Sequence, residues 1–183
     1  KYEILNEVQQ DLFIDRHSRQ SGLVTCTDLQ GRQLRRYVDT RLYRDALAIL
    51  RETDLNEQVL NRCAILKGLE SYNLLLDERS YLDYSAIMDR AVEVMTNDDA
   101  VRDRLTERVR YVIVDEYQDV NLIQEAIVWL LHDLGAEVCV VGDDDQTIYQ
   151  WRGSDIQNIR TFTKRYPRVK QVALNENFRS SLG

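Results

Sequence analysis

Cysteine, glycine and long apolar runs are all scarce in this chain of 183 residues. Its three cysteines, Cys26, Cys63 and Cys139, are odd in number, far apart and not arranged as C-x-x-C, so neither a disulfide framework nor a zinc site follows. No apolar run approaches the roughly 20 residues that span a bilayer, and the start carries no signal-peptide pattern. We therefore expect a cytosolic (cytoplasmic) protein without a membrane segment, in which Cys139 is a core residue.

The seven glycines include no G-x-x-x-x-G-K-[ST] sequence. A phosphate-cradling loop of that type is therefore absent from residues 1–183. The remaining composition, 44% hydrophobic and 30% charged, is that of an ordinary soluble globular protein. The length suggests one domain, or one and a half.

Basic residues gather in one segment, although the whole chain carries a net charge of −7. From Arg16 to Arg51 there are eight arginines and three aspartates, which gives a local net charge of +5. A local excess of this kind attracts phosphate backbones even when the total is acidic. A solvated helical face with alternating charges explains the same pattern equally well.

The periodicity divides the chain into two parts. Residues 1–107 are mostly helical, with apolar residues at three-to-four spacing in 39–50, 55–76 and 82–95. In 39–50 that stripe includes Leu42, Tyr43 and Leu47, and the β-leaning run Leu23 to Thr27 is a short strand or a loop. After Arg108, strands alternate with helices, which predicts a mostly parallel sheet and an α/β fold.

The expected order in the second part is strand, helix, strand, helix, strand. The strands are Tyr111 to Asp115, Glu137 to Val141 and Val169 to Leu174. The first helix begins near Asn121, which forms a capping box with Gln124, and Gly135 follows its end. Leu122, Ile123, Ala126, Ile127, Leu130, Leu131 and Leu134 form its buried stripe. The second helix begins at Ser154 and stops before Pro167.

The most informative residues follow the first of these strands, where Asp115 and Glu116 stand side by side. Open α/β sheets place ligands at the carboxyl ends of their strands. A carboxylate pair at that position suits one group that holds Mg²⁺ and one that orients or deprotonates an attacking water. Taken alone, a solvated acidic turn is an equally good interpretation.

Two later segments carry further candidates. After the second strand, Gln146 offers an amide that can hold a water or a phosphate oxygen, and Tyr149 and Trp151 beside Arg152 are suited to stacking on unpaired bases. After the third strand, Arg179 offers a planar donor to phosphate and Phe178 a surface for a flat ring. Core packing of the aromatic residues and a surface position for the arginine are the alternatives.

These three segments together resemble motifs II, III and IV of superfamily 1 helicases, most closely the UvrD/Rep/PcrA branch. The three are Asp-Glu-Tyr-Gln-Asp, Gly-Asp-Asp-Asp-Gln-Thr-Ile-Tyr-Gln-Trp-Arg-Gly and Asn-Phe-Arg-Ser-Ser, in the family's order. The match is specific over residues 105–181 and only architectural before them. It implies a mostly helical subdomain of the 1B type over 1–107. Residues 108–183 would then be part of a RecA-like P-loop NTPase sheet of subdomain 1A.

The resemblance also implies a role for each candidate residue. Asp115 would hold Mg²⁺ and Glu116 would be the catalytic base, with Gln118 and Asp119 in the network around them. Gln146 and Arg179 would be catalytic contacts to the γ-phosphate of ATP, and Phe178 would lie against the adenine. Tyr149 and Trp151 would bind single-stranded DNA. The implied function is ATP-dependent 3′-to-5′ translocation on single-stranded DNA and unwinding of duplex junctions, as in DNA repair.

The chain departs from the family pattern by what it omits. It has neither the P-loop nor the later motifs of a second domain, so we interpret it as an excerpt that is inactive as an ATPase alone. A subunit of a helicase-nuclease of the RecB or AddA kind shares the same motifs and remains an alternative. A nucleic-acid-binding module without catalysis is the other. A phosphohydrolase built on Asp115 and the Asp143 cluster is disfavoured, because no His or further carboxylate converges on it in sequence.

Overall fold

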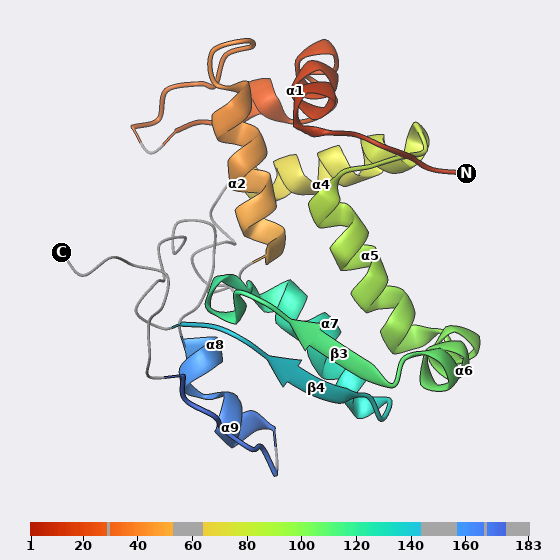
Figure 1. Cartoon of the computed structure of the whole chain (residues 1–183). Helices are drawn as coiled ribbons and strands as arrows, with labels where there is room; N and C mark the ends of the chain where they lie inside the picture. Colours follow the sequence, from red (N-terminus) through yellow and green to blue (C-terminus); the bar gives the residue numbers. More distant parts are fainter. Residues whose placement is uncertain (29, 53–63, 144–156, 167, 175–183) are drawn as a thin grey trace, which may run out of the picture.

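A computed structural model describes residues 1–28, 30–52, 64–143, 157–166 and 168–174. Within these ranges a mostly helical part comes first, and a small parallel sheet with its helices follows (Figure 1). The expected change in secondary structure is confirmed, because the last helix of the first part ends at Arg108 and a strand begins at Tyr111. The chain thus has a mixed helix and strand fold with small parallel sheets.

The first part is built from helices and two very short strands. Its elements are β1 (Glu3–Ile4), α1 (Glu7–Arg16), the 3-10 helix η1 (Leu23–Thr25), α2 (Thr40–Glu52), α4 (Ala64–Glu78), β2 (Tyr81–Leu82), α5 (Tyr84–Asn97) and α6 (Asp99–Arg108). The β1 and β2 strands pair in parallel. The run Leu23 to Thr27, expected to be a strand or a loop, contains η1, whose glycine cap Gly22 has a φ of 86°.

The core of this part lies between α1, α2 and α4. Tyr43 and Leu47 of α2, Tyr72 of α4 and Ile14 of α1 are fully buried. The expected stripe of α2 is therefore confirmed at Tyr43 and Leu47, but it is wrong at Leu42, which is 56% exposed. Residues four apart share a helix face, whereas Leu42 is rotated about 100° around the helix axis from Tyr43.

The arginines of the basic segment are largely engaged within the protein. Arg32 binds Asp28 and Asp39, and Arg44 binds Asp11 and Asp45. The side chains of Arg44 and Arg51 are themselves buried, with exposed fractions of 8% and 4%. The local charge of +5 is thus partly neutralised by acidic neighbours, which favours the alternating-charge interpretation for these arginines.

Arg51 forms a buried ion pair with the residue that caps α5. Its Nη1 donates to Asp83 at 2.7 Å and to Ser85 at 2.8 Å. Asp83 is the N-cap of α5, because its side chain accepts the Ala86 N–H at 2.7 Å, and it also accepts from Gln10. One carboxylate therefore joins α1, α2 and α5.

The second part of the chain contains the expected parallel strands. Its elements are β3 (Tyr111–Val114), the 3-10 helix η2 (Tyr117–Asp119), α7 (Leu122–Asp133), β4 (Glu137–Val140), α8 (Gln157–Arg160) and α9 (Phe162–Arg165). The β3 and β4 strands pair in parallel, with Tyr111 opposite Glu137 and Val114 opposite Val140. The predicted capping box at Asn121 with Gln124 is confirmed, and Gly135 has the positive φ of 98° expected after the helix end.

Only one face of this sheet is covered within the described part of the chain. Val114, Val138 and Val140 pack against a cluster that includes Val128 of α7 and Phe162 of α9. On the opposite face Ile113 is 76% exposed, and Cys139 is exposed rather than in the core, so that prediction was wrong. Alternate residues of a strand face opposite sides, and Cys139 has the parity of the open side.

Three further expectations need correction. Leu122, expected in the buried stripe of α7, is exposed, and Glu125 and Val128 are buried instead. The helix expected before Pro167 is divided, where described, into α8 and α9. Residues Val169 to Leu174 form no strand with any described residue, and Leu174 is 89% exposed. An isolated extended segment has no ladder to stabilise it as a strand.

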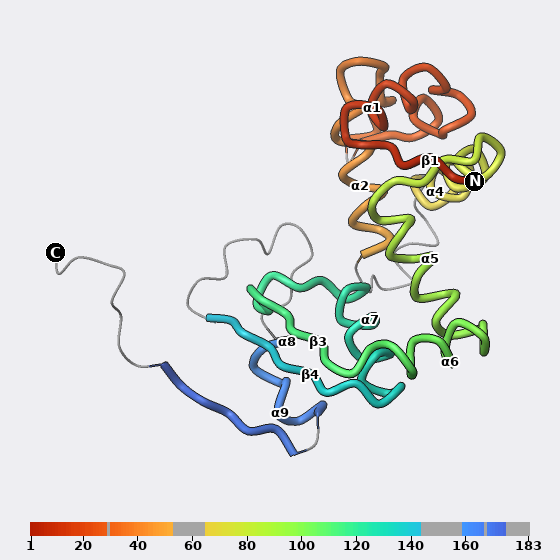
Figure 2. The backbone as a smooth tube through the Cα atoms, turned by 45° about the vertical axis from the view of Figure 1, so that its right-hand side comes forward, coloured from red at the N-terminus to blue at the C-terminus, as the bar shows by residue number. Residues whose placement is uncertain are grey.

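Among the described residues, the two parts are joined by packing, by an ion pair between Arg102 of α6 and Asp133 of α7, and by a hydrogen bond at the start of α7. In Figures 1 and 2, α5 runs from the helical part toward α6 beside the sheet, and it packs against α7. The amide of Asn121, which caps α7, donates to Glu52 at the end of α2 at 2.9 Å. No helix among the described residues is long and apolar enough to cross a membrane.

We predict that Asp83→Ala destabilises the chain far more than loss of a helix cap alone. Removing one partner of a buried ion pair leaves Arg51 as an unpaired buried charge, at a cost of about 3–5 kcal/mol. Asp98→Ala is the matched control, because Asp98 caps α6 by accepting the Val101 N–H but is exposed. It should cost about 1 kcal/mol. Urea unfolding measures both, and equal losses would contradict the role of the pair.

Candidate functional site

The carboxyl ends of β3 and β4 meet at one edge of the sheet. Val141 N–H donates to Val114 O at 2.8 Å, and Tyr117 N–H donates to Val141 O at 2.9 Å. Two backbone hydrogen bonds thus continue the pairing beyond the strands themselves. They hold the loop that contains Asp115 and Glu116 against the loop that begins at Val141.

Glu116 has an unusual backbone conformation for a residue other than glycine. Its φ of 50° and ψ of 43° lie in the left-handed region, which costs on the order of 1–3 kcal/mol and persists only where the surroundings impose it. Here the Glu116 N–H donates to Asp115 Oδ1 at 2.9 Å, and Glu116 O accepts the Asp119 N–H at 2.8 Å. The chain therefore turns sharply after β3, and both carboxylates are exposed at the strand end.

Gln118 connects this turn to the loop after β4. Its Nε2 donates to Glu116 Oε2 at 2.6 Å, and its Oε1 accepts the Asp143 N–H at 3.0 Å. The side chain is only 1% exposed. Gly142 leaves room for it, since a Cβ at that position would lie 2.6 Å from Gln118 Oε1 and 2.9 Å from Ile159 Cδ1.

Tyr117 anchors the same turn to α7 and α9. It is fully buried, its ring meets Phe162 edge-on with centroids 5.3 Å apart, and its hydroxyl donates to Glu125. Glu125 also accepts from Arg165 and from the Tyr166 hydroxyl, the latter at 3.0 Å. Burial, together with the neighbouring Glu125, raises the pKa of both tyrosines above the ordinary value, so both remain neutral donors.

Sequence reasoning missed Glu125 and gave Tyr117 no role of its own. Its position in the sequence could have indicated its burial, because Glu125 lies within the stretch of α7 that was expected to face the core. A buried carboxylate needs partners, and its partners come from η2 and α9. Tyr117 lies eight positions before Glu125, whereas Arg165 and Tyr166 lie 40 and 41 positions after it, and local periodicity does not detect the two distant partners.

Of the expected site residues, only Asp115 and Glu116, with the neighbouring Gln118 and Asp119, fall within the described residues. Gln146, Tyr149, Trp151, Phe178 and Arg179 lie outside them, so their roles stay predictions. Across the described ranges no group of three or more His, Cys, Asp or Glu residues is arranged to hold a metal ion. Mg²⁺ needs fewer protein ligands, because it is usually held by one or two carboxylates with waters and substrate phosphates. The exposed carboxylate of Asp115 fits that requirement.

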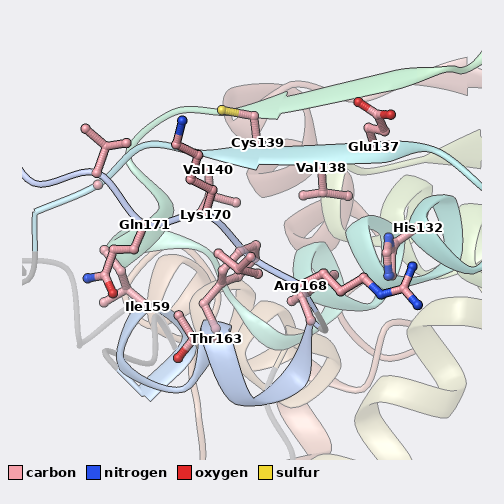
Figure 3. A pocket seen from close by; sticks show the side chains of 15 residues that line it. His132, Glu137, Val138, Cys139, Val140, Ile159, Thr163, Arg168, Lys170 and Gln171 are labelled. Atoms are coloured by element: carbon pink, nitrogen blue, oxygen red, sulfur yellow. The ribbon is translucent and has the colours of Figure 1, made fainter.

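A groove follows β4 on the side away from β3. It encloses about 510 Å³ and is lined by Val138, Val140, Phe162, Tyr166 and the segment 168–172. Figure 3 shows Val138 pointing from β4 into the groove, while Cys139 points to the other face. Gly142 is part of its lining, so the groove reaches the carboxyl end of β4. In the described part of the chain, β4 pairs with β3 alone.

Comparison with known proteins gives one family. The protein-family model described as UvrD/REP helicase N-terminal domain matches residues 6–167. The chain is 35% identical over 112 residues to ATP-dependent DNA helicase Rep of Buchnera aphidicola, covering 61% of this chain and 17% of that protein. It is 36% identical over 115 residues to DNA helicase II of Salmonella typhimurium, covering 63% and 16%.

A third relative is ATP-dependent DNA helicase PcrA of Staphylococcus aureus. It is 38% identical over 110 residues, which cover 60% of this chain and 15% of that protein. The chain therefore spans 15–17% of the length of these three relatives.

We predict that Tyr117→Phe destabilises the protein by about 1.5–3 kcal/mol, the usual range for a hydrogen bond to a charged group. The ring contact with Phe162 is kept, so the loss reports the hydroxyl's bonds, donated to Glu125 and accepted from Arg165. Tyr111→Phe is the control, because Tyr111 is exposed on the open face of the sheet. The unfolding free energy in urea should be unchanged for the control. A Tyr117→Phe variant as stable as the control would refute the anchoring role.

Proposed function

The chain belongs to the UvrD/REP helicase family, of the UvrD/Rep/PcrA type, and on this premise we propose that it carries the hydrolytic carboxylates of an ATP-dependent DNA helicase. The observation that supports this most is the turn at Glu116. A left-handed glutamate at the carboxyl end of a parallel strand, bridged by Gln118 to the next strand end, is an arrangement held in place at some cost in backbone strain.

In this proposal Asp115 and Glu116 divide the work. Asp115 would hold Mg²⁺, which would supply charge neutralisation to the phosphates of ATP. Glu116 accepts a hydrogen bond from the attacking water, orients it and takes its proton. Tyr117 and Gln118 keep the turn fixed from both sides. Phosphoryl transfer depends mainly on positioning and charge stabilisation, so rigidity of this turn is the protein's main contribution here.

The remaining site residues are proposed from the family motifs. Gln146 and Arg179 would contact the γ-phosphate, and Phe178 would lie against the adenine. Tyr149 and Trp151 would stack on bases of single-stranded DNA. Gln118 accepts a hydrogen bond from the Asp143 N–H, and Asp143 lies three positions before Gln146 in the sequence. This bond supports a connection between the carboxylates and the segment that contains Gln146.

We further propose that the phosphate-binding loop comes from a segment outside residues 1–183. These residues contain no G-x-x-x-x-G-K-[ST] sequence, and the chain spans only 15–17% of its relatives' length. Residues 1–107 would then be a 1B-like helical subdomain, and 108–183 part of a RecA-like subdomain 1A.

The partner that follows is DNA, since the relatives are named as DNA helicases. We propose that ATP hydrolysis moves the full-length protein 3′ to 5′ along single-stranded DNA and opens duplex junctions, as in DNA repair. A helicase-nuclease subunit would share the carboxylates but carry a nuclease domain elsewhere in the chain. A module without catalysis would bind DNA and leave ATP intact.

Glu116→Gln tests the proposal in the full-length protein. We expect DNA-stimulated ATP turnover to fall about 10²- to 10⁴-fold, the usual contribution of a general base, while the affinity for a non-hydrolysable ATP analogue is kept. Glu137→Gln is the control, because Glu137 lies at the opposite end of β4. The Glu137→Gln variant should hydrolyse ATP at the normal rate. Wild-type turnover in Glu116→Gln would exclude its role as the base. Lost nucleotide binding would mean a structural role instead.

A further inference from the structure

We infer that Gln118 is the positioning residue for Glu116, and that its amide fixes the distance between the Glu116 carboxylate and the loop after β4. This inference rests on the proposed function, since it concerns how the base is held. It goes further by assigning the position of the base to one side chain outside the carboxylate pair.

The hydrogen-bond partners allow only one orientation of the amide. The Asp143 N–H can only donate, so the Gln118 atom 3.0 Å from it must be the carbonyl oxygen. The Glu116 carboxylate can only accept when ionised, so the atom 2.6 Å from it must be the amide nitrogen. Both bonds are satisfied together, and rotating the amide by 180° would break both.

The space around Gln118 also allows little movement. The side chain is 1% exposed, and its oxygen lies where even a methyl group on Gly142 would come within 2.6 Å. The residue before it, Tyr117, is fixed by its hydroxyl bond to Glu125. A buried side chain with two bonds at its tip has lost its rotamer freedom already, so it can act as a rigid spacer.

Glu116 needs such a spacer because its own side chain is exposed. An exposed glutamate samples several rotamers, whereas a base must be held close to its productive position. The bridge limits that sampling. It also links the Glu116 carboxylate directly to the backbone at Asp143, beside the backbone bond between Tyr117 and Val141.

Two variants separate the two halves of the bridge. Gln118→Glu keeps an oxygen that accepts the Asp143 N–H but replaces the donor to Glu116 by a like charge. Gln118→Met keeps the length of the side chain and removes both bonds. Gln124→Met is the control, since Gln124 lies near the same turn, is exposed, and accepts the Asn121 N–H in the cap of α7.

The measurements are kcat and KM for ATP in the full-length protein, and hydrogen exchange of the Asp143 amide. Both Gln118 variants should lower kcat about ten- to a hundred-fold with KM nearly unchanged, because a base misplaced by about 1 Å costs that much. Exchange at Asp143 should be about five-fold faster in Gln118→Met, for a lost bond of about 1 kcal/mol. It should stay slow in Gln118→Glu and in the Gln124→Met control.

Either of two results would overturn the inference. One is wild-type kcat in Gln118→Met, which folds without burying a charge. The other is unchanged exchange at Asp143 in the same variant. If the wild-type protein itself fails to hydrolyse ATP, the proposed function is rejected instead. If the wild-type protein hydrolyses ATP and both Gln118 variants do so at the same rate, only the role of Gln118 is rejected.

Discussion

The parallel pairing of β3 with β4 is the interaction on which the site depends. It brings two strand ends to one edge, and the bonds from Val141 N–H and Tyr117 N–H extend it into the loops. The turn at Glu116 can then take a strained left-handed conformation, because both sides of it are held. Tyr117 fixes the turn to α7 and α9 below, and Gln118 fixes it to the loop after β4. The bond from Gln118 to Asp143 depends on this pairing, because Asp143 follows β4.

The helical part is connected to this edge through the end of α2. Arg51 binds the cap of α5, and the next residue, Glu52, binds the cap of α7. Both helices therefore begin at side chains that α2 holds, and α7 follows directly after η2. Two neighbouring residues of α2 thus connect the helical core to α7, which follows the turn at Glu116. The bond between Glu52 and Asn121 is a direct contact between the two parts, and the sequence pattern does not predict it.

Local signals predicted much of the fold, and long-range contacts account for what they missed. The capping box at Asn121 and the two apolar strands were predictable, because each is set by residues within a few positions. Burial on a sheet face was not predictable from local sequence. Cys139 lies in an apolar run, but its exposure depends on whether another element packs on that face of the sheet. The position of Asp115 and Glu116 at the end of a strand was also predictable, and β3 ends at Val114. Glu125 and the bridging role of Gln118 depend on partners tens of residues away, which no periodicity reports.

The central claim is that the end of β3 holds the metal-bound phosphates of ATP beside a base. The most direct measurement is Mn²⁺ binding, followed by its electron paramagnetic resonance, to the full-length protein with a non-hydrolysable ATP analogue. We predict that Asp115→Asn weakens Mn²⁺ binding at least about ten-fold, because a neutral amide replaces a hard anionic ligand. Asp133→Asn, an exposed site at the end of α7, should leave it unchanged. Equal Mn²⁺ affinity in wild type and Asp115→Asn would contradict the account.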